Sequence, residues 1–266
     1  MKDRAENSLA EKYPDIAAEW NTARNEGLLP NSLSCKSGKK VWWICHNCGN
    51  EWQATVHNRT LHRTGCPKCA KHQHTSFPEQ AVYFYVKQFF PDTISSYLYS
   101  DQKEIDIYIP SLKIGIEYDG LNWHTDAQKD ERKNEELRQM GIRLIRIRER
   151  NAKKKELSPL HNTWLTIPYD IKGNEYLTAD QCMNLMIENV LRAIILLGKQ
   201  QAPPQEIETV VDVRKDTGAI QAQYRERIYM RSLAFRFPDI AAEWDYEKNG
   251  GLTPDSVPYG FDQNIW

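Results

Sequence analysis

The stretch EIDIYIPSLKIGIEYDG, residues 104–120, determines the fold that we expect for the central part of the chain. Isoleucine stands at every second position in both halves of this stretch, which is the side-chain period of β-strands with one buried face. A turn at residues 110–113 would fold the halves together and place Ile109 opposite Ile114. The stretch therefore predicts an antiparallel hairpin of two short strands.

The predicted hairpin places two acidic residues side by side. In the register set by the isoleucines, Asp106 lies opposite Glu117, with Cβ atoms about 5 Å apart. Two like charges at this distance repel each other, and a divalent cation would remove the repulsion. Carboxylate oxygens suit Mg²⁺, which activates water and stabilises charge on a phosphodiester. The alternative is that both residues are solvent-facing positions of an amphipathic hairpin.

Further polar residues follow the second strand. Asp119 adds a third carboxylate, and His124 places an imidazole just beyond the strand. We expect a helix from residue 125 or 126 to Gly141 that carries Asp130, and then a strand at residues 142–148 that returns into the sheet. These additions favour a catalytic metal site over a solvent-facing hairpin.

Residues 76–150 resemble the Vsr-like branch of the PD-(D/E)xK nuclease superfamily, the branch of the very-short-patch repair endonucleases. The resemblance rests on IExDG-x-x-WH, on D-x-R in the following helix and on L-x-x-x-G-x-R at its end. It implies an α/β fold with a restriction-endonuclease-like mixed sheet and flanking helices, and Mg²⁺-dependent cleavage of DNA. It also implies roles for single residues: Asp106 as chief metal ligand, a backbone oxygen near Tyr118, His124 as catalytic histidine, Asp130 as its acidic partner and Glu79 as the acid of the first helix.

Two positions leave this interpretation open. Glu79 stands three residues after Ser76, which is the spacing of a helix capping box as well as that of an active-site acid. The superfamily's usual lysine, two residues after the glutamate, is replaced by Asp119. Water activation would then fall to His124 or to a hydroxide on the metal. If neither serves, the domain is a binding relic.

Two CxxC pairs near the N-terminus predict a structural zinc site. The pairs occupy residues 45–48 and 66–69, and two such turns complete the tetrahedral sulfur shell that zinc prefers. Cys35 and His46 are rival ligands, but Cys35 aligns with a tyrosine in the internal repeat described below, and His46 is expected at the surface. The expected ligands are Cys45, Cys48, Cys66 and Cys69.

Residues 8–70 resemble the zinc-ribbon (treble-clef-like) domain family. The resemblance rests on a WW-x-C hairpin, a W-x-A-x-V-x-x-R segment and a final G-C-P-x-C. It implies a nucleic-acid-associated protein without fixing a function. Tryptophans 42, 43 and 52 are too many aromatics for so small a fold unless they form its core beside the metal. The expected phosphate contacts, which would be independent of sequence and sensitive to salt, are Arg59, Arg63, Lys68 and Lys71.

An internal repeat defines the two ends of the chain. Residues 8–30 and 232–254 share 14 of 23 positions, including the heptapeptide PDIAAEW in both copies. We expect residues 232–266 to be a truncated second ribbon. The predicted domains are therefore a zinc ribbon at 1–75, a nuclease core at 76–150, a helical or mixed extension at 151–231 and the truncated ribbon.

Charge and composition indicate where a polyanion would bind. The formal net charge is −1, yet residues 36–74 contain seven Lys or Arg and one acid, and residues 129–155 contain eleven against five. Basic segments in a neutral chain suggest DNA contacted at defined places, and arginines and lysines of 143–155 would extend that surface unless Arg146 and Arg148 line the sheet edge. No signal peptide or membrane helix is expected, which predicts a cytoplasmic protein without a membrane partner.

The combined prediction is a cytoplasmic, Mg²⁺-dependent DNA endonuclease that structural Zn²⁺ and its ribbon position on DNA. Asp106 and Glu117 would hold the Mg²⁺, and Asp119 is a third candidate ligand. His124 would act as general base or acid, with Asp130 and Glu79 orienting His124 or a metal-bound water. The first alternative is an inactive nucleic-acid-binding adaptor that keeps a nuclease-like fold. The second is a nuclease for RNA or branched DNA. The oligomeric state is open.

Overall fold

The computed structural model describes residues 7–46, 49–61, 64–67, 75–100, 103–121, 124, 126–151, 156–198, 211–249, 252–255 and 257. The chain divides into two compact units. One unit comprises Ser76–Asp216, and the other comprises Met1–Thr75 with Thr217–Trp266. Each unit is described by itself below.

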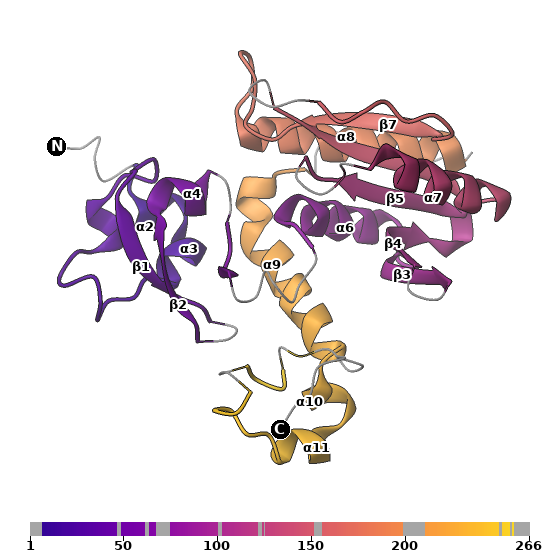
Figure 1. The fold of residues 1–266 in the computed structure, drawn as a ribbon. Helices are drawn as coiled ribbons and strands as arrows, with labels where there is room; N and C mark the ends of the chain where they lie inside the picture. The colour runs from indigo at the N-terminus through magenta and orange to yellow at the C-terminus, as the bar shows by residue number, and fades with distance from the viewer. Residues whose placement is uncertain are drawn as a thin grey trace. The chain divides into compact units, whose positions relative to one another are not determined.

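The Ser76–Asp216 unit is a mixed α/β structure built on one five-stranded sheet (Figure 1). The strand order is β3-β4-β5-β6-β7. The first three strands pair antiparallel, whereas β5, β6 and β7 are parallel to one another. The strands are β3 (Ile94–Ser100), β4 (Lys103–Ile109), β5 (Ile114–Asp119), β6 (Arg143–Arg150) and β7 (Leu165–Asp170).

The predicted hairpin is confirmed as β4 and β5. Ile109 pairs with Ile114 and Ile107 pairs with Ile116, all of them at most 2% exposed. The turn is a short 3-10 helix, η2 (Pro110–Leu112), followed by a residue at φ +50°. Alternating isoleucines thus set the register, because a slip of one position would expose them all.

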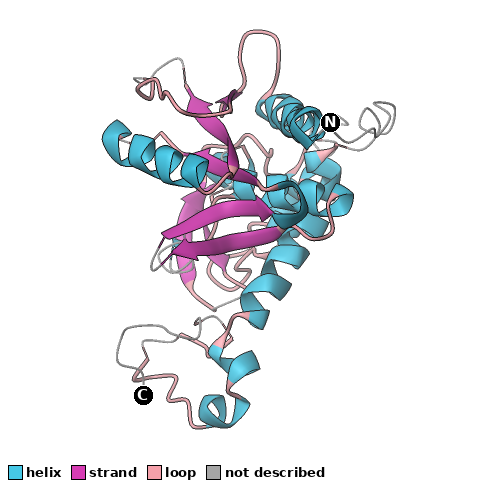
Figure 2. Ribbon diagram, turned by 90° about the vertical axis from the view of Figure 1, so that its right-hand side faces the viewer, coloured by secondary structure: helices cyan, strands magenta, loops and turns pink. Residues whose placement is uncertain are grey.

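Helices flank the sheet of the Ser76–Asp216 unit (Figure 2). They are α6 (Phe77–Phe89), α7 (Ala127–Gln139) and α8 (Ala179–Gly198). The side chain of Asp126 caps the start of α7, and Gly141, at φ +73°, follows its end as expected. The helix α7 packs against β6, whereas α8 packs against β7 and α6.

The sheet continues past residue 150, where the sequence analysis places the end of the nuclease core. Strand β7 and helix α8 fall in the same compact unit as that core. Helix α9 (Val213–Met230) begins there too, since Tyr85 on α6 donates a hydrogen bond to Asp216 at 2.7 Å. Residues 156–198 therefore belong to the same unit as the predicted nuclease core.

Helix α8 is long and apolar enough, by length and composition alone, to cross a membrane. One of its faces is buried in the sheet unit, including Met186, Ile187, Val190 and Ile194, each at most 2% exposed. Its packing against β7 and α6 is that of a core helix. Cys182 lies on the same buried face.

The N-terminal ribbon is a hairpin with short helices packed against it. Strands β1 (Lys40–Ile44) and β2 (Glu51–Thr55) pair antiparallel, with Trp43 opposite Trp52. Trp43 is fully buried and Trp52 is 9% exposed, whereas Trp42 lies outside this core beneath the guanidinium of Arg24. The prediction that all three tryptophans form the core is therefore wrong for Trp42. The helices are α2 (Leu9–Lys12), α3 (Pro14–Ala18), η1 (Pro30–Ser32) and α4 (Val56–Thr60).

The second copy of the repeat has the backbone structure of the first. Helices α10 (Leu233–Arg236) and α11 (Pro238–Ala242) match α2 and α3. The indole N–H of Trp244 donates to the Leu252 carbonyl at 2.8 Å, as that of Trp20 donates to the Leu28 carbonyl at 3.0 Å. The repeat in sequence is thus a repeat in structure.

The two copies differ in what covers them. Tyr13 and Ile16 are 5% exposed in the first copy, where they belong to one core with Trp43 of the hairpin. The equivalent Phe237 and Ile240 are 48% and 54% exposed. Burial in the first copy therefore depends on the β1–β2 hairpin.

Candidate active site

Asp106 and Glu117 lie on neighbouring strands, at the point where the pairing of β4 with β5 ends. The last paired residues on this side are Ile107 and Ile116. Beyond this pair, hydrogen bonds from backbone to side chain connect the two strands. The backbone N–H of Asp106 donates to Glu117 Oε1 at 3.3 Å, and that of Tyr118 donates to Asp106 Oδ2 at 2.8 Å. The structure thus brings together the two carboxylates that the sequence singles out, here called the carboxylate pair.

Negative charge at the carboxylate pair is only partly compensated. Burial raises the pKa of Asp106 well above its usual value of 3.8, and the charges of Glu117 and Glu79 raise it further. The ammonium of Lys133 opposes this shift and lies 2.5 Å from Glu117 Oε2. The guanidinium of Arg146 is more distant, at 3.7 Å from the same oxygen.

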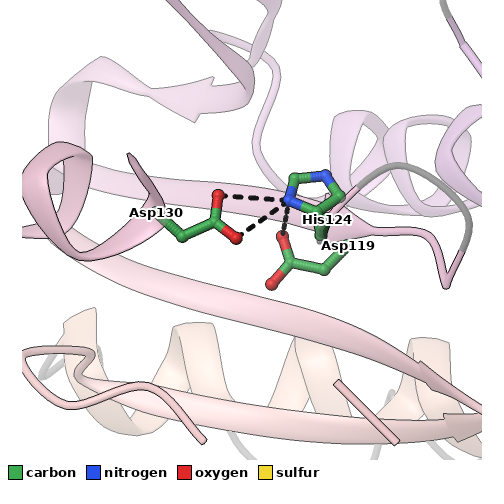
Figure 3. A group of neighbouring side chains, drawn as sticks. All are labelled: Asp119, His124 and Asp130. Atoms are coloured by element: carbon green, nitrogen blue, oxygen red, sulfur yellow. Dashed lines mark hydrogen bonds and ion pairs between the residues drawn. The ribbon is translucent and has the colours of Figure 1, made fainter. Parts of the chain in front are cut away.

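His124 stands beside two other carboxylates (Figure 3). Its Nδ1 lies 3.2 Å from both carboxylate oxygens of Asp130 and 3.4 Å from Asp119 Oδ1. An ionised carboxylate only accepts hydrogen bonds, so Nδ1 carries the proton and Nε2 is the basic nitrogen. Figure 3 shows the second ring nitrogen facing away from both carboxylates. We call these three residues the His124 cluster.

The two acids of the His124 cluster differ in their ionisation. Burial raises the pKa of Asp119 to about 6, even though the Arg146 guanidinium lowers it. Neither carboxylate oxygen of Asp119 accepts a hydrogen bond within the described part of the chain. The pKa of Asp130 is below its usual value, because the hydrogen bond from His124 and the charge of Arg146 outweigh the effect of burial. Asp130 is therefore the ionised partner of His124.

Two arginines of β6 face the acids of β5. In the parallel register Glu117 pairs with Arg146 and Asp119 pairs with Arg148. Arg146 is fully buried, with its guanidinium 3.3 Å from both Asp119 and Asp130. The predictions that Arg146 and Arg148 belong to a DNA-binding surface or line the edge of the sheet are both wrong, because both side chains are buried. Strand β6 is interior, and Arg146 and Arg148 offset part of the negative charge of the site.

The charge balance decides where a divalent cation fits. The ligand atoms of Asp119, His124 and Asp130 all lie within 4.8 Å of one another. However, Arg146 and Arg148 already compensate the two acids of this cluster. The carboxylate pair has two acids, with a third nearby, and chiefly one ammonium, so its oxygen donors fit Mg²⁺ better than the His124 cluster does.

Glu79 has a structural role that the structure shows directly. Its carboxylate accepts from the backbone N–H of Ser76 at 3.4 Å, and its own N–H donates to Ser76 Oγ at 3.4 Å. This reciprocal capping box begins α6. The charge of Glu79 still raises the pKa of Asp106, so it lies near the carboxylate pair. An active-site role for Glu79 stays a prediction.

Sequence reasoning missed two residues of the site, Lys133 and Glu149, and assigned Arg146 a different role. Glu149 accepts from Tyr118 Oη at 2.7 Å and from the backbone N–H of Leu121 at 2.9 Å. It thereby holds the end of β5, from which the chain leads to His124. The alternation of arginine with isoleucine in β6 was the available signal, because it matches the alternation of acids in β5.

Two of the four predicted zinc ligands lie in the core of the ribbon. Cys45 and Cys66 are buried at 4% and 6% exposure in the ribbon core, and Asn50 donates a hydrogen bond to Cys66 Sγ at 3.5 Å. Cys48 and Cys69 lie outside the described residues. Two buried thiols in one small core are suited to supply two ligands of the tetrahedral sulfur shell that structural zinc prefers.

Arg59 is not available to DNA. Its side chain is buried in an ion pair with Glu19, and its guanidinium lies 5.0 and 5.1 Å from the ring centroids of Trp43 and Trp52. The prediction of a phosphate contact by Arg59 is therefore wrong, because this arginine holds the ribbon core together. The other predicted contacts, Arg63, Lys68 and Lys71, lie outside the described residues.

Comparison with known proteins supports the ribbon. No curated protein matches the chain. The family described as "Probable Treble clef zinc finger domain" matches residues 16–72, a span that includes both CxxC pairs and the β1–β2 hairpin. The N-terminal part of the chain is thus similar to a zinc finger domain, a class that suggests structural zinc and nucleic-acid binding.

Proposed function

We propose that this chain is a Mg²⁺-dependent endonuclease that hydrolyses DNA phosphodiester bonds. One observation carries the proposal: the carboxylate pair and the His124 cluster lie together at the end of β5, joined by Arg146, which is within 4.0 Å of Glu117, Asp119 and Asp130. The mixed sheet with flanking helices agrees with the Vsr-like resemblance of residues 76–150.

In this proposal Asp106 and Glu117 hold Mg²⁺. Bound there, the ion would supply positive charge to the scissile phosphate and favour ionisation of water. The strands present the two carboxylates already close together, and each of them is hydrogen-bonded to the backbone of the other strand. The protein thus fixes the ligands before the ion binds, which limits the ordering cost of binding.

His124 is the proposed general base. Its Nε2 takes a proton from the attacking water while the water oxygen bonds to phosphorus and the bond from phosphorus to the leaving oxygen breaks. Asp130 accepts from Nδ1, which fixes the tautomer and stabilises the imidazolium that forms. The side chain of His124 is 25% exposed, so a substrate can reach it. General base catalysis of this kind contributes roughly 10²- to 10⁴-fold.

The zinc finger is proposed to hold the enzyme on DNA. Since Arg59 is buried, the described candidates for phosphate contacts are the exposed lysines that precede or begin β1, namely Lys36, Lys39 and Lys40. Such contacts would be independent of sequence and would weaken with salt.

A specific observation favours the second candidate, a DNA-binding adaptor without turnover. Glu117 already has an ammonium at 2.5 Å, and Asp119 stands where the resemblance expects a lysine. An adaptor would bind DNA in a salt-sensitive manner with or without Mg²⁺, and it would cut nothing.

The decisive experiment is cleavage of supercoiled plasmid, linear duplex, branched DNA and RNA by the zinc-loaded protein, with Mg²⁺, with Mn²⁺ or with neither. Asp106→Ala and Glu117→Ala should abolish metal-dependent cleavage with folding and zinc content unchanged. Glu104→Gln is the matched control, because Glu104 is an exposed acid on the same strand as Asp106. Binding without cleavage of any substrate by the wild type would favour the adaptor, and preferred cleavage of RNA would change the substrate class.

A further inference from the structure

Lys133 is the cation closest to the carboxylate pair, and it comes from helix α7, not from a strand. The helix buries Asp130, Asn134 and Leu137 towards the sheet, and Lys133, three residues after Asp130, is half-buried at the margin of that face. Its Nζ lies 2.5 Å from Glu117 Oε2, and its side chain is 23% exposed. The ammonium therefore reaches the pair from the solvent side of the site.

Among the described residues, only Lys133 and Arg146 place a cationic nitrogen within 4.0 Å of Glu117. Arg146 is fully buried, is 3.7 Å away and also serves Asp119 and Asp130 at 3.3 Å. Its fixed planar group cannot leave these partners without uncovering buried charge. Lys133 has a flexible stem, access to solvent and, among the described residues, one ion pair within 4.0 Å, so of these two cations it is the one that can move.

Position 119, where the superfamily pattern has a lysine, holds an aspartate that contacts other residues of the site. Asp119 is fully buried, faces Arg146 at 3.3 Å and lies 3.4 Å from His124 Nδ1. A lysine at position 119 would bring a third cation to Arg146 and Arg148. The two arginines of β6 therefore favour an acid at position 119. An ammonium for the carboxylate pair has to come from another element.

We infer that Lys133 is the resident counter-ion of the carboxylate pair and that it stands in for the lysine absent from position 119. When a divalent cation engages Asp106 and Glu117, the ammonium leaves Glu117 and turns to an oxygen of the scissile phosphate. There it donates hydrogen bonds and stabilises the charge that develops during hydrolysis. This inference rests on the proposed function for its phosphate contact, but its exchange with a divalent cation does not depend on turnover.

The test measures Mn²⁺ binding and DNA cleavage by the full zinc-loaded chain at pH 8. Lys133→Met keeps the apolar stem and removes the ammonium, and Lys133→Arg keeps the charge. The matched control is Lys103→Met, because Lys103 forms an exposed ion pair with Glu136 at 2.7 Å in the same unit. Asp106→Asn identifies which Mn²⁺ site is observed.

The expected result has two parts with opposite signs. Lys133→Met should bind Mn²⁺ roughly threefold to tenfold more tightly, since a competing charge is gone, yet cleave DNA roughly 100-fold more slowly at saturating Mn²⁺. Lys133→Arg should bind Mn²⁺ as the wild type does, and Lys103→Met should change neither quantity. A purely structural lysine would weaken metal binding and cleavage together.

Mn²⁺ affinity that is unchanged or weaker in a folded Lys133→Met variant would overturn the inference. If that variant does not fold, Lys133→Arg decides, because loss of Mn²⁺ binding despite retained charge would contradict a counter-ion role. If the wild type cleaves no substrate, the proposed function fails. The Mn²⁺ measurement would still decide whether Lys133 exchanges with a divalent cation.

Discussion

Replacing Arg146 with leucine should destabilise the sheet unit more than any other single change at the site. The guanidinium is fully buried and lies within 4.0 Å of three carboxylates, those of Glu117, Asp119 and Asp130. Removing one partner of a buried ion pair costs roughly 3–5 kcal/mol, because a buried charge is left uncompensated. Each carboxylate keeps another cationic or histidine contact, so we expect the lower end, about 3 kcal/mol.

The expected loss of stability corresponds to a measurable decrease in Tm. A unit of about 140 residues unfolds with an entropy of roughly 0.3 kcal/mol/K, so the loss corresponds to a Tm lower by roughly 10 °C. Circular dichroism would follow melting, and hydrogen exchange of the β5 and β6 amides would localise the effect. Arg150→Leu is the control on the same strand, because the Arg150–Asp170 pair at 3.0 Å is largely exposed and should contribute at most about 1 kcal/mol.

The cost of Arg146→Leu should also grow with pH. The pKa of Asp119 is raised to about 6 from 3.8, so its ionisation lowers stability as pH rises from about 4 to about 6. Arg146 lowers that pKa, and without it the loss of stability continues to higher pH. At pH 5 Asp119 is mostly protonated, so the variant should be less impaired there than at pH 8, by roughly 1–2 kcal/mol. A cost no larger than that of Arg150→Leu, or one independent of pH, would refute this electrostatic account.

Three further predictions concern other parts of the chain. Cys45→Ser, or removal of zinc by a chelator, should unfold the ribbon and shift its tryptophan fluorescence to the red while hydrogen exchange shows the sheet amides still protected. His124→Asn should slow cleavage at least about 100-fold with Mn²⁺ affinity unchanged in a binding titration, and equal losses of both would contradict a general base. Trp20→Ala should destabilise its copy of the repeat by roughly 3–5 kcal/mol in denaturant titrations, because Trp20 packs on Trp43 at 5.5 Å between ring centroids, whereas the less buried Trp244 should cost less.

Local signals explain the parts of the fold that could be predicted. The isoleucine alternation and the turn at 110–113 are enough to set the register of β4 with β5, since one face is buried. Asp126 and Gly141 bound α7 through capping and a positive φ, both short-range effects. Strand β7 escaped prediction because Pro168 interrupts its sequence, which a strand tolerates at the edge of a sheet.

The partners of the site could not be predicted in the same way. Asp106 and Glu117 come from one hairpin, so their proximity follows from local register. Lys133 and Arg146 reach Glu117 across a helix and a parallel strand, and nothing in the spacing fixes that packing. Arg59 shows the converse error, because a basic residue in a basic segment turned out to be buried against two tryptophans.

The arrangement of charge at the site has a cost in stability. Burying Glu117, Asp119 and Arg146 in the interior of a sheet is not an efficient source of stability, since apolar residues of similar volume commonly do as well or better. The raised pKa values of Asp106 and Asp119 indicate that ionisation there opposes folding. A purely structural strand pair would gain from isoleucine or leucine at these positions, as the opposite face of β5 already has. The excess of acid is confined to the carboxylate pair, whereas the His124 cluster is balanced by arginine. That asymmetry is what a site needs if it is to bind one cation at the pair and leave Nε2 of His124 free to accept a proton beside it.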